Sequence, residues 1–280
     1  MNAVTLLGVK GGPAIRPGSP MPTASLLELD GQKVLIDAGL GASQGLIRAG
    51  VGLHELDAIC ITHLHSDHYL ELGPLLHTAW TAGLARELPV YGPDGLAEYW
   101  RHFCAAMAFD ISLRIADEGR PDLHALPQFQ PIEPGAQIGP LSLAAMRNVH
   151  PPITDSFALR VTGSRSVTFS GDTAPMEEMA RFAQGSDLLV HEAMLSAGID
   201  ALCARVGNGD DRLRTHLERS HAPAAEVGRI AAQAGVGALA LHHLVPSDDP
   251  DFTEEDWRRE VARHWSGPLY VGRDGMRIPL

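Results

Sequence analysis

The sequence predicts a layered α/β fold that forms one domain over residues 1–280. The chain has 280 residues, of which 45% are hydrophobic, and this is enough to bury a large core without an internal linker. Short apolar runs of strand character alternate with longer helical patterns in two clusters along the chain. Glycine, proline and aspartate punctuate these runs where turns are expected.

The first cluster begins with a core strand and a hairpin. The apolar N-terminus, Met1–Gly8, lacks the basic region and long apolar stretch of a signal peptide, so a first core strand is expected. The runs Leu26–Leu29 and Lys33–Asp37 flank Asp30-Gly31, which is a hairpin turn signal. A further strand over Leu56–Thr62 leads into a histidine-rich segment.

Two helices separated by a short strand complete this cluster. The strand covers Leu88–Tyr91 and is stopped by Gly92-Pro93. The helices are expected over Leu70–Ala85 and Gly95–Met107. The segment Phe103–Pro134 carries several prolines that break any long helix, so it is expected to be irregular.

The second cluster starts with a strand at Leu141. A hairpin is expected from Ser156–Thr162 and Arg165–Ser170, which flank Gly163-Ser164. A helix opened by proline is then expected over Pro175–Phe182, followed by a strand over Asp187–His191 and a second helix opened by proline over Ala222–Ala234. A last helix is expected over Thr253–Trp265, with Thr253 as its cap and Asp256 as the acidic partner.

Charge and cysteine usage limit the partners and the compartment. The formal net charge is −12, from 34 acidic and 22 basic residues, so long-range electrostatics repel a polyanion and favour a small-molecule substrate. Cys60, Cys104 and Cys203 lack C-x-x-C spacing and are expected to be buried free thiols of a reducing compartment. No stretch approaches the roughly 20 apolar residues of a membrane span. A cytoplasmic protein without membrane contact is expected.

Residues 62–69 carry the strongest functional signal. They read Thr-His-Leu-His-Ser-Asp-His-Tyr and place three imidazoles and a carboxylate directly after a predicted strand. Imidazole and carboxylate are preferred ligands of zinc, manganese and iron. His63 and His65 are two apart and project to the same side, whereas Asp67 and His68 lie beyond the turn and can reach a second ion. The alternative interpretation is a histidine-rich surface loop.

Three further candidate ligands argue against that alternative, because each lies just past a predicted strand end. They are His150, Asp172 and His243. His242 competes with His243 for the last position, since both close the same apolar run.

These motifs resemble those of the metallo-β-lactamase superfamily, in which H-x-H-x-D-H, a later His, an Asp and a last His hold two metals at the edge of a β-sandwich. The resemblance is sharpest toward the ribonuclease Z and phosphodiesterase branch. It runs from about Gly8 to Pro246 through five further motifs: Val34–Gly39, Ser170–Thr173, His191–Ala193, Ser220–Ala222 and His242–Pro246. Together with the alternating elements, it implies a four-layer αββα sandwich, the metallo-β-lactamase fold.

The resemblance implies a dinuclear centre in which Asp172 bridges two divalent metal ions. Zinc is the expected metal, with manganese or iron as alternatives. The family order of His, apolar residue, any residue and Pro favours His243 over His242. Each ion then has three further ligands: His63, His65 and His150 for the first, and Asp67, His68 and His243 for the second.

A two-metal geometry indicates a mechanism, and the resemblance implies its proton donor. Two ions can share a bridging hydroxide that attacks the ester, and Asp67 would orient it. The leaving group would take its proton from His221, the histidine of the Ser-His motif, paired with Glu192 of the His-Glu-Ala motif. The alternative is that Glu192 only supports a ligand and His221 caps the helix opened by Pro223.

One interval departs from ribonuclease Z. Only 21 residues separate His150 from Asp172, and the predicted hairpin uses most of them. Ribonuclease Z typically places its long tRNA-gripping arm there. The residues Ala193-Met194 and Ala222-Pro223 also differ from those usual in that family. Therefore tRNA is not expected as a partner, and the family suggests a homodimer.

Loops and isolated residues complete the expectations. Three stretches are expected to shape specificity: Gly11–Pro22, Phe103–Pro134, and Leu195–Arg219, which could form a helical cap between Glu192 and His221. Asp37 and His191 are expected to support the ligands from behind. The histidines without ligand spacing are expected to be surface or core residues: His54, His77, His102, His124, His216 and His264.

The sequence thus predicts a dinuclear metal-dependent hydrolase of small phosphodiesters or related phosphate esters. Hydrolysis of a carboxylic ester, a lactone or an arylsulfate is an alternative, because the same site could polarise a C=O or S=O group. A non-catalytic metal-binding scaffold or sensor is an alternative of another class, and the retention of Glu192 and His221 argues against it.

Overall fold

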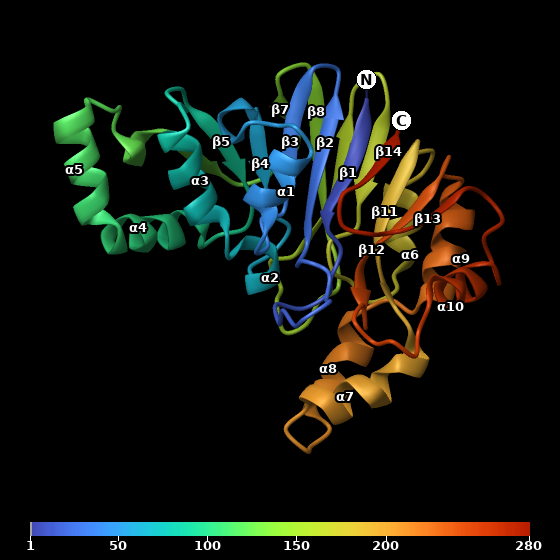
Figure 1. Ribbon diagram of the computed structural model, residues 1–280. Helices are drawn as coiled ribbons and strands as arrows, with labels where there is room; N and C mark the ends of the chain where they lie inside the picture. The colour runs from blue at the N-terminus through green and yellow to red at the C-terminus, as the bar shows by residue number, and fades with distance from the viewer. Residues whose placement is uncertain (1) are drawn as a thin grey trace.

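The computed structural model describes residues 2–280 and contains two seven-stranded sheets packed face to face between layers of helices, which confirms the predicted αββα sandwich (Figure 1). The strand order in the first sheet is β14 (Met276–Pro279), β1 (Ala3–Gly8), β2 (Ala24–Leu29), β3 (Gln32–Ile36), β4 (Ala58–Cys60), β5 (Leu88–Tyr91) and β6 (Pro127–Gln130). The order in the second sheet is β13 (Leu269–Val271), β12 (Leu239–Val245), β11 (Leu188–Met194), β10 (Ser166–Phe169), β9 (Phe157–Thr162), β8 (Leu141–Arg147) and β7 (Ala136–Ile138).

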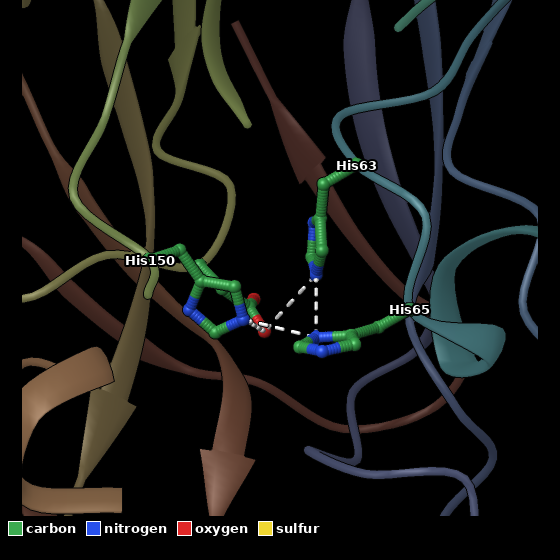
Figure 2. Close-up of side chains that lie close together, drawn as sticks. His63, His65 and His150 are labelled. Carbon is green, nitrogen blue, oxygen red and sulfur yellow. Dashed lines mark hydrogen bonds and ion pairs between the residues drawn. The ribbon is translucent and has the colours of Figure 1, made fainter. Parts of the chain in front are cut away.

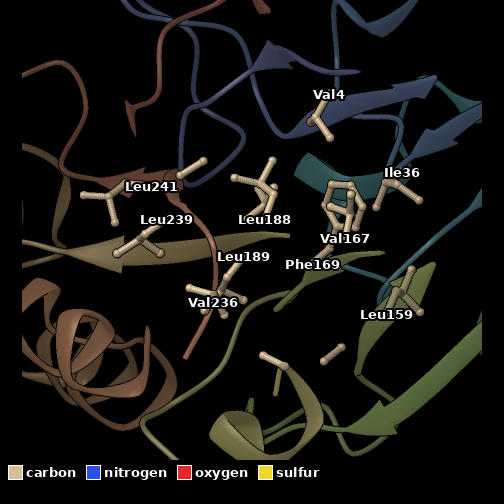
Figure 3. Close-up of a cluster of buried hydrophobic side chains, with 14 of the residues drawn as sticks. Val4, Ile36, Leu159, Val167, Phe169, Leu188, Leu189, Val236, Leu239 and Leu241 are labelled. Atoms are coloured by element: carbon tan, nitrogen blue, oxygen red, sulfur yellow. The ribbon is translucent and has the colours of Figure 1, made fainter. Parts of the chain in front are cut away.

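The main core lies between the two sheets, and the alternation of side chains along each strand creates it. In the β2–β3 pair, Leu27 and Val34 oppose each other and face the second sheet. The neighbouring pair, Leu26 and Leu35, points to the opposite face and packs with the outer helices. Figure 3 shows buried side chains from both sheets gathered in the inner cluster. Both sheets are therefore fixed in register by burial on two faces.

Helices cover the outer faces of both sheets and project from two places (Figure 1). On the side of the first sheet lie α1 (Ala42–Arg48), α2 (Ser66–Tyr69), α3 (Leu72–Thr81), α4 (Leu96–Ala106) and α5 (Ala108–Glu118). On the side of the second sheet lie α6 (Glu177–Phe182), α9 (Ala224–Ala234) and α10 (Glu254–Val261), while α7 (Ile199–Val206) and α8 (Arg212–Ser220) project from one end of the sandwich. Within residues 2–280, no helix combines the length and apolar character needed to cross a membrane.

Several local signals match the structure closely. Asp30 and Gly31 form the turn between β2 and β3, with φ of 50° and 84°, which is the left-handed conformation that a two-residue hairpin turn requires. The first strand is fully buried. Thr253 and Asp256 form the expected capping box, in which the backbone N–H of Thr253 donates to the Asp256 carboxylate at 2.7 Å.

Two segments differ from the sequence prediction. The predicted strand Leu56–Thr62 is reduced to β4, because the backbone N–H of Thr62 donates to the side chain of Asp37 and not to a neighbouring strand. The predicted irregular segment Phe103–Pro134 contains the helix α5, which ends at Gly119 with a left-handed φ of 67°. The prolines lie beyond that helix end, so they do not break it.

Candidate metal centre

The histidine-rich segment leaves β4 in an extended conformation and then turns into α2. The backbone at His65 is still extended, with φ −82° and ψ 143°, so the side chains of His63 and His65 point to the same side. Asp67 and His68 occupy the first turn of α2 and are buried. One short segment thereby presents ligand atoms at two neighbouring points.

Three imidazoles converge in a first group (Figure 2). The Nδ1 atom of His65 lies 3.1 Å from Nε2 of His63 and 2.9 Å from Nε2 of His150. Zinc–nitrogen bonds of about 2.0–2.1 Å in a tetrahedron imply ligand separations of about 3.3 Å, which is close to these distances. The Nδ1 atom of His150 is bonded to the carbonyl oxygen of Ser220 at 3.0 Å, and this leaves its Nε2 lone pair for a metal.

A second group is formed by Asp67, His68 and His243. The Oδ2 atom of Asp67 lies 3.3 Å from Nε2 of His243 and 3.7 Å from Nε2 of His68. The other ring nitrogen of His68, Nδ1, lies 2.8 Å from Oδ2 of Asp37, whose Oδ1 accepts a hydrogen bond from the backbone of Thr62. Asp37 therefore holds the ring of His68 with Nε2 toward the group, as the sequence predicted for a supporting residue.

Asp172 lies between the two groups. Its Oδ2 atom is 3.8 Å from His63 and 3.9 Å from His150 in the first group, and 3.3 Å from His68 and 3.0 Å from His243 in the second. The residue follows Gly171, which adopts a left-handed φ of 58°. A Cβ atom at Gly171 would lie 2.5 Å from the carbonyl oxygen of Phe157, so only glycine allows this turn.

Two histidines of the first group have the protonation state that a metal ligand requires. Burial lowers the pKa of His63 well below its ordinary value and lowers the pKa of His150 to about 4. Both rings are therefore neutral and have a nitrogen lone pair that can bind a metal. Two buried polar atoms, Nε2 of His68 and Oδ1 of Asp172, have no hydrogen-bond partner among residues 2–280. Buried polar atoms are nearly always satisfied, and cations at the two groups would satisfy these.

Glu192 and His221 form a buried pair beside the two groups. Nδ1 of His221 lies 3.1 Å and 3.2 Å from the two carboxylate oxygens of Glu192, and Glu192 also accepts the backbone N–H of Thr173 at 2.7 Å. Burial alone would lower the pKa of His221, but the facing Glu192 carboxylate raises it to about 9. The ring of His221 stacks on His243 with centroids 5.3 Å apart. With Nδ1 engaged by Glu192, only Nε2 of His221 is left for a further partner.

A cavity of about 330 Å³ opens over both groups. Residues of two predicted specificity stretches line it, namely Gly11–Pro22 and Leu195–Arg219. No residue of the third stretch, Phe103–Pro134, lines this cavity, which corrects that expectation. The reason is tertiary, because α4 and α5 project on the far side of the first sheet, away from α7 and α8 (Figure 1).

His242 and His191 are adjacent in sequence to candidate site residues but make different contacts. Nε2 of His242 is 2.8 Å from the carbonyl oxygen of Gly8. His191 is buried and bonds through Nδ1 to the carbonyl oxygen of Glu192 at 2.7 Å. Neither residue belongs to the described clusters of candidate ligands.

His216 is the residue that sequence reasoning missed. It was expected to be a surface or core residue, but it lies on α8 and lines the cavity. Its ring centroid is 6.0 Å from those of His65 and His150 and 5.9 Å from that of His221. The spacing of His216 along the sequence matches no ligand pattern, and only the docking of α8 brings it to the site.

The contact between Asp37 and His68 gives a testable prediction. Asp37→Asn should weaken metal affinity by roughly 10- to 100-fold, because the residue that orients the ligand loses its charge. A competition titration against a chelator measures this. Asp117→Asn, an exposed carboxylate on α5, is the matched control and should leave the affinity unchanged. Equal affinities of both variants would show that Asp37 does not support a metal ligand.

The chain matches the family model described as Metallo-beta-lactamase superfamily over residues 18–197. A protein of Mycolicibacterium gilvum (strain PYR-GCK) named Ribonuclease Z is 33% identical over 294 residues, covering 100% of this chain and 96% of that protein. A protein of the same name from Mycobacterium bovis (strain BCG / Pasteur 1173P2) is 32% identical over 288 residues, covering 100% and 99%.

Solved structures share the fold at lower identity. The metallo-beta-lactamase fold protein YhfI from Bacillus subtilis superposes with a TM-score of 0.73 at 24% identity, covering 99% of both chains. The short form of human tRNase Z gives 0.69 at 20% identity, covering 99% of this chain and 98% of that one. A diphosphatase from the PhnP family gives 0.68 at 14% identity, covering 100% and 98%.

Proposed function

We propose that this chain, which belongs to the metallo-beta-lactamase superfamily and to its ribonuclease Z and phosphodiesterase branch, is a metal-dependent hydrolase of small phosphodiesters. The observation that carries the proposal is the position of Asp172. One of its carboxylate oxygens, Oδ2, lies within 3.0–3.9 Å of histidines from both ligand groups. That arrangement suits a dinuclear site. Zinc fits the set of nitrogen and oxygen donors best.

The residues that would hold the ions are the two groups described above. Asp172 would contact both ions, and each ion would have three further ligands: His63, His65 and His150, and Asp67, His68 and His243. When bound, two ions lower the pKa of water and polarise a phosphoryl oxygen. The protein's own contribution is to fix the ligands, orient the nucleophile and supply a proton.

Asp67 and the Glu192–His221 pair would carry those roles. Oδ2 of Asp67 also accepts the backbone N–H of Gly12 at 2.8 Å, which ties the carboxylate to the loop over the cavity and fixes its direction. His221 lines the cavity and is held by Glu192, so it can donate a proton from Nε2 to the departing oxygen. The backbone N–H of Thr173 donates to the same Glu192 oxygen and so fixes the position of the pair.

Three observations support a small substrate. The interval between His150 and Asp172 is occupied by the β9–β10 hairpin, and the turn between these strands is short. The net charge of −12 disfavours a polyanion. The cavity of about 330 Å³ is near the small end of the range for small-molecule sites. Together they support a diester with modest organic groups.

Transfer RNA is the second candidate substrate, because the relatives carry the name Ribonuclease Z. The alignment to the Mycobacterium bovis protein has 288 positions and includes all 280 residues of this chain. It therefore leaves only about eight positions for residues that this chain lacks. That relative is named Ribonuclease Z and has no long insertion relative to this chain, so the short interval between His150 and Asp172 weighs less against tRNA than the net charge and the cavity do.

The two candidates are separated by comparing substrates on the metal-loaded protein. We expect hydrolysis of bis(p-nitrophenyl) phosphate with a higher kcat/KM than cleavage of precursor tRNA, because the acidic surface repels a polyanion. Protein stripped of metal serves as the control for contaminating nucleases. Cleavage of the precursor at its 3′ processing position with the higher kcat/KM would establish tRNA as the substrate.

A further inference from the structure

The cavity has one apolar wall, and two helices outside the sandwich build it. Leu202 and Val206 lie four residues apart on α7, and Leu213 and Leu217 lie four residues apart on α8. Residues at this spacing share one helix face. Both faces are turned to the cavity, where Val245 at the end of β12 extends the wall.

The packing of this wall points to a missing apolar neighbour. Leu217 and Val245 are buried against the body of the protein. Leu202 and Leu213 are only partly buried, and Val206 is 39% exposed. The two helices project from the sandwich (Figure 1), yet they keep leucine and valine on the face beside the candidate ligands. Apolar side chains that line a concave site are typical of surfaces that bind an apolar ligand group.

Ion pairs hold this wall in position. Asp248 binds Lys10 at 3.2 Å, Arg16 at 3.0 Å and, from α7, Arg205 at 3.1 Å, while Arg205 also binds Asp249 at 3.2 Å. The Lys10 and Asp248 side chains are only 5% and 6% exposed. The cluster ties α7 to the N-terminal loop and to the chain after β12. Asp248 also neutralises Lys10 and Arg16, which line the cavity, so these cations are poorly suited to bind a second phosphate.

We propose that the wall formed by α7 and α8 binds an apolar, ring-sized group of the ester, so that the substrates are phosphodiesters of hydrophobic alcohols. This inference rests on the proposed phosphodiesterase function and names its substrate class. The phosphate would lie toward the metal ions that Asp67 and Asp172 would help to hold. The hydrophobic group would contact Leu202 and Leu213 on the opposite side of the cavity.

The test compares two diesters that share a leaving group and have similar intrinsic reactivity. Benzyl p-nitrophenyl phosphate and methyl p-nitrophenyl phosphate differ only in the group that would meet the wall. The metal-loaded protein should hydrolyse the benzyl ester with a kcat/KM roughly 10- to 100-fold higher, as expected for burial of one ring. Thymidine 5′-p-nitrophenyl phosphate, whose organic group is large but polar, should fall below the benzyl ester.

Two wall variants and one matched control locate the effect. Leu213→Asn and Val206→Asn should each reduce the benzyl-to-methyl ratio of kcat/KM by roughly fivefold or more, since a polar side chain replaces an apolar contact. Val206 is already partly exposed, so its variant should fold. Ala204→Asn places the same side chain at an exposed position of α7 that does not line the cavity, and it should leave the ratio unchanged.

A binding measurement gives a readout that does not depend on turnover. Benzylphosphonate should bind the metal-loaded protein roughly tenfold more tightly than methylphosphonate by calorimetry, and Leu213→Asn should remove that difference. Equal kcat/KM for the two diesters, or an unchanged ratio in both wall variants, would overturn this inference while leaving the hydrolase proposal intact. Failure to hydrolyse any phosphodiester would instead refute the proposed function itself.

Discussion

Elemental analysis of the purified protein should find close to two transition-metal ions per chain, and His63→Ala or His243→Ala should lower metal content and activity together. The two histidines belong to different ligand groups, and both lie within 3.8 Å of the shared oxygen of Asp172. Loss of one ion removes several kcal/mol of charge stabilisation in the transition state, so we expect a fall in kcat of roughly a thousandfold or more.

His242 provides the matched control for this experiment. It neighbours His243 in sequence but bonds to the carbonyl oxygen of Gly8. His242→Gln should therefore retain both ions, although it should lower the melting temperature because a buried hydrogen bond is disturbed. Full metal content and full turnover in both alanine variants would reject the ligand assignment. A greater loss of metal from His242→Gln than from His243→Ala would assign the last ligand to His242.

His221→Ala should keep both metals yet reduce the hydrolysis rate by roughly 10²- to 10⁴-fold, the usual contribution of general acid catalysis. The loss should be largest for a diester with an alkoxide leaving group. It should shrink for p-nitrophenolate, because that anion hardly needs protonation. A series of diesters with graded leaving-group pKa measures this dependence directly.

Glu192 is tested in the same series. Glu192→Gln should show the same trend with smaller size, since it leaves the His221 imidazole in place but removes the carboxylate that holds its Nδ1. The double variant should lose much less hydrolysis rate than the two separate losses multiplied together, because the residues act as a unit. Metal content must be measured beside each rate, since His221 stacks on His243. A loss that is independent of the leaving group, or that follows metal depletion, would give the pair a structural role.

The layered fold and the ligand motif could be predicted from the sequence because both depend on local patterns. Strand alternation marks two buried faces, and Asp30-Gly31 forms its turn by backbone preference alone. His63 and His65 gain a common direction from an extended backbone, and Asp67 follows one turn later. Such features need no information about distant parts of the chain.

The family motif favours His243 over His242, but the physical reason for that choice lies in the tertiary structure. Successive residues of a regular strand point to opposite faces, but the pairing of β11 with β12 shifts register beside these two residues. His243 adopts a left-handed φ of 41°. Local irregularity of this kind depends on the neighbouring strand, so strand alternation could not predict which ring faces Asp172. The structure places the ring of His243 there and the ring of His242 against Gly8.

Composition and strand alternation thus predicted a layered α/β fold, and the H-x-H-x-D-H motif marked the first candidate ligands, while the resemblance to the metallo-β-lactamase superfamily implied the αββα sandwich and the full ligand set. The surroundings of that ligand set were decided by tertiary packing. His216 and Leu213 reach the cavity because α8 docks beside it, held through Arg205 on α7 and Asp248 beyond β12. The segment Phe103–Pro134 lies elsewhere, although its composition looked equally suited to a specificity loop. Short-range spacing fixes which side chains share a face, whereas contacts between residues far apart in sequence fix which cavity that face meets.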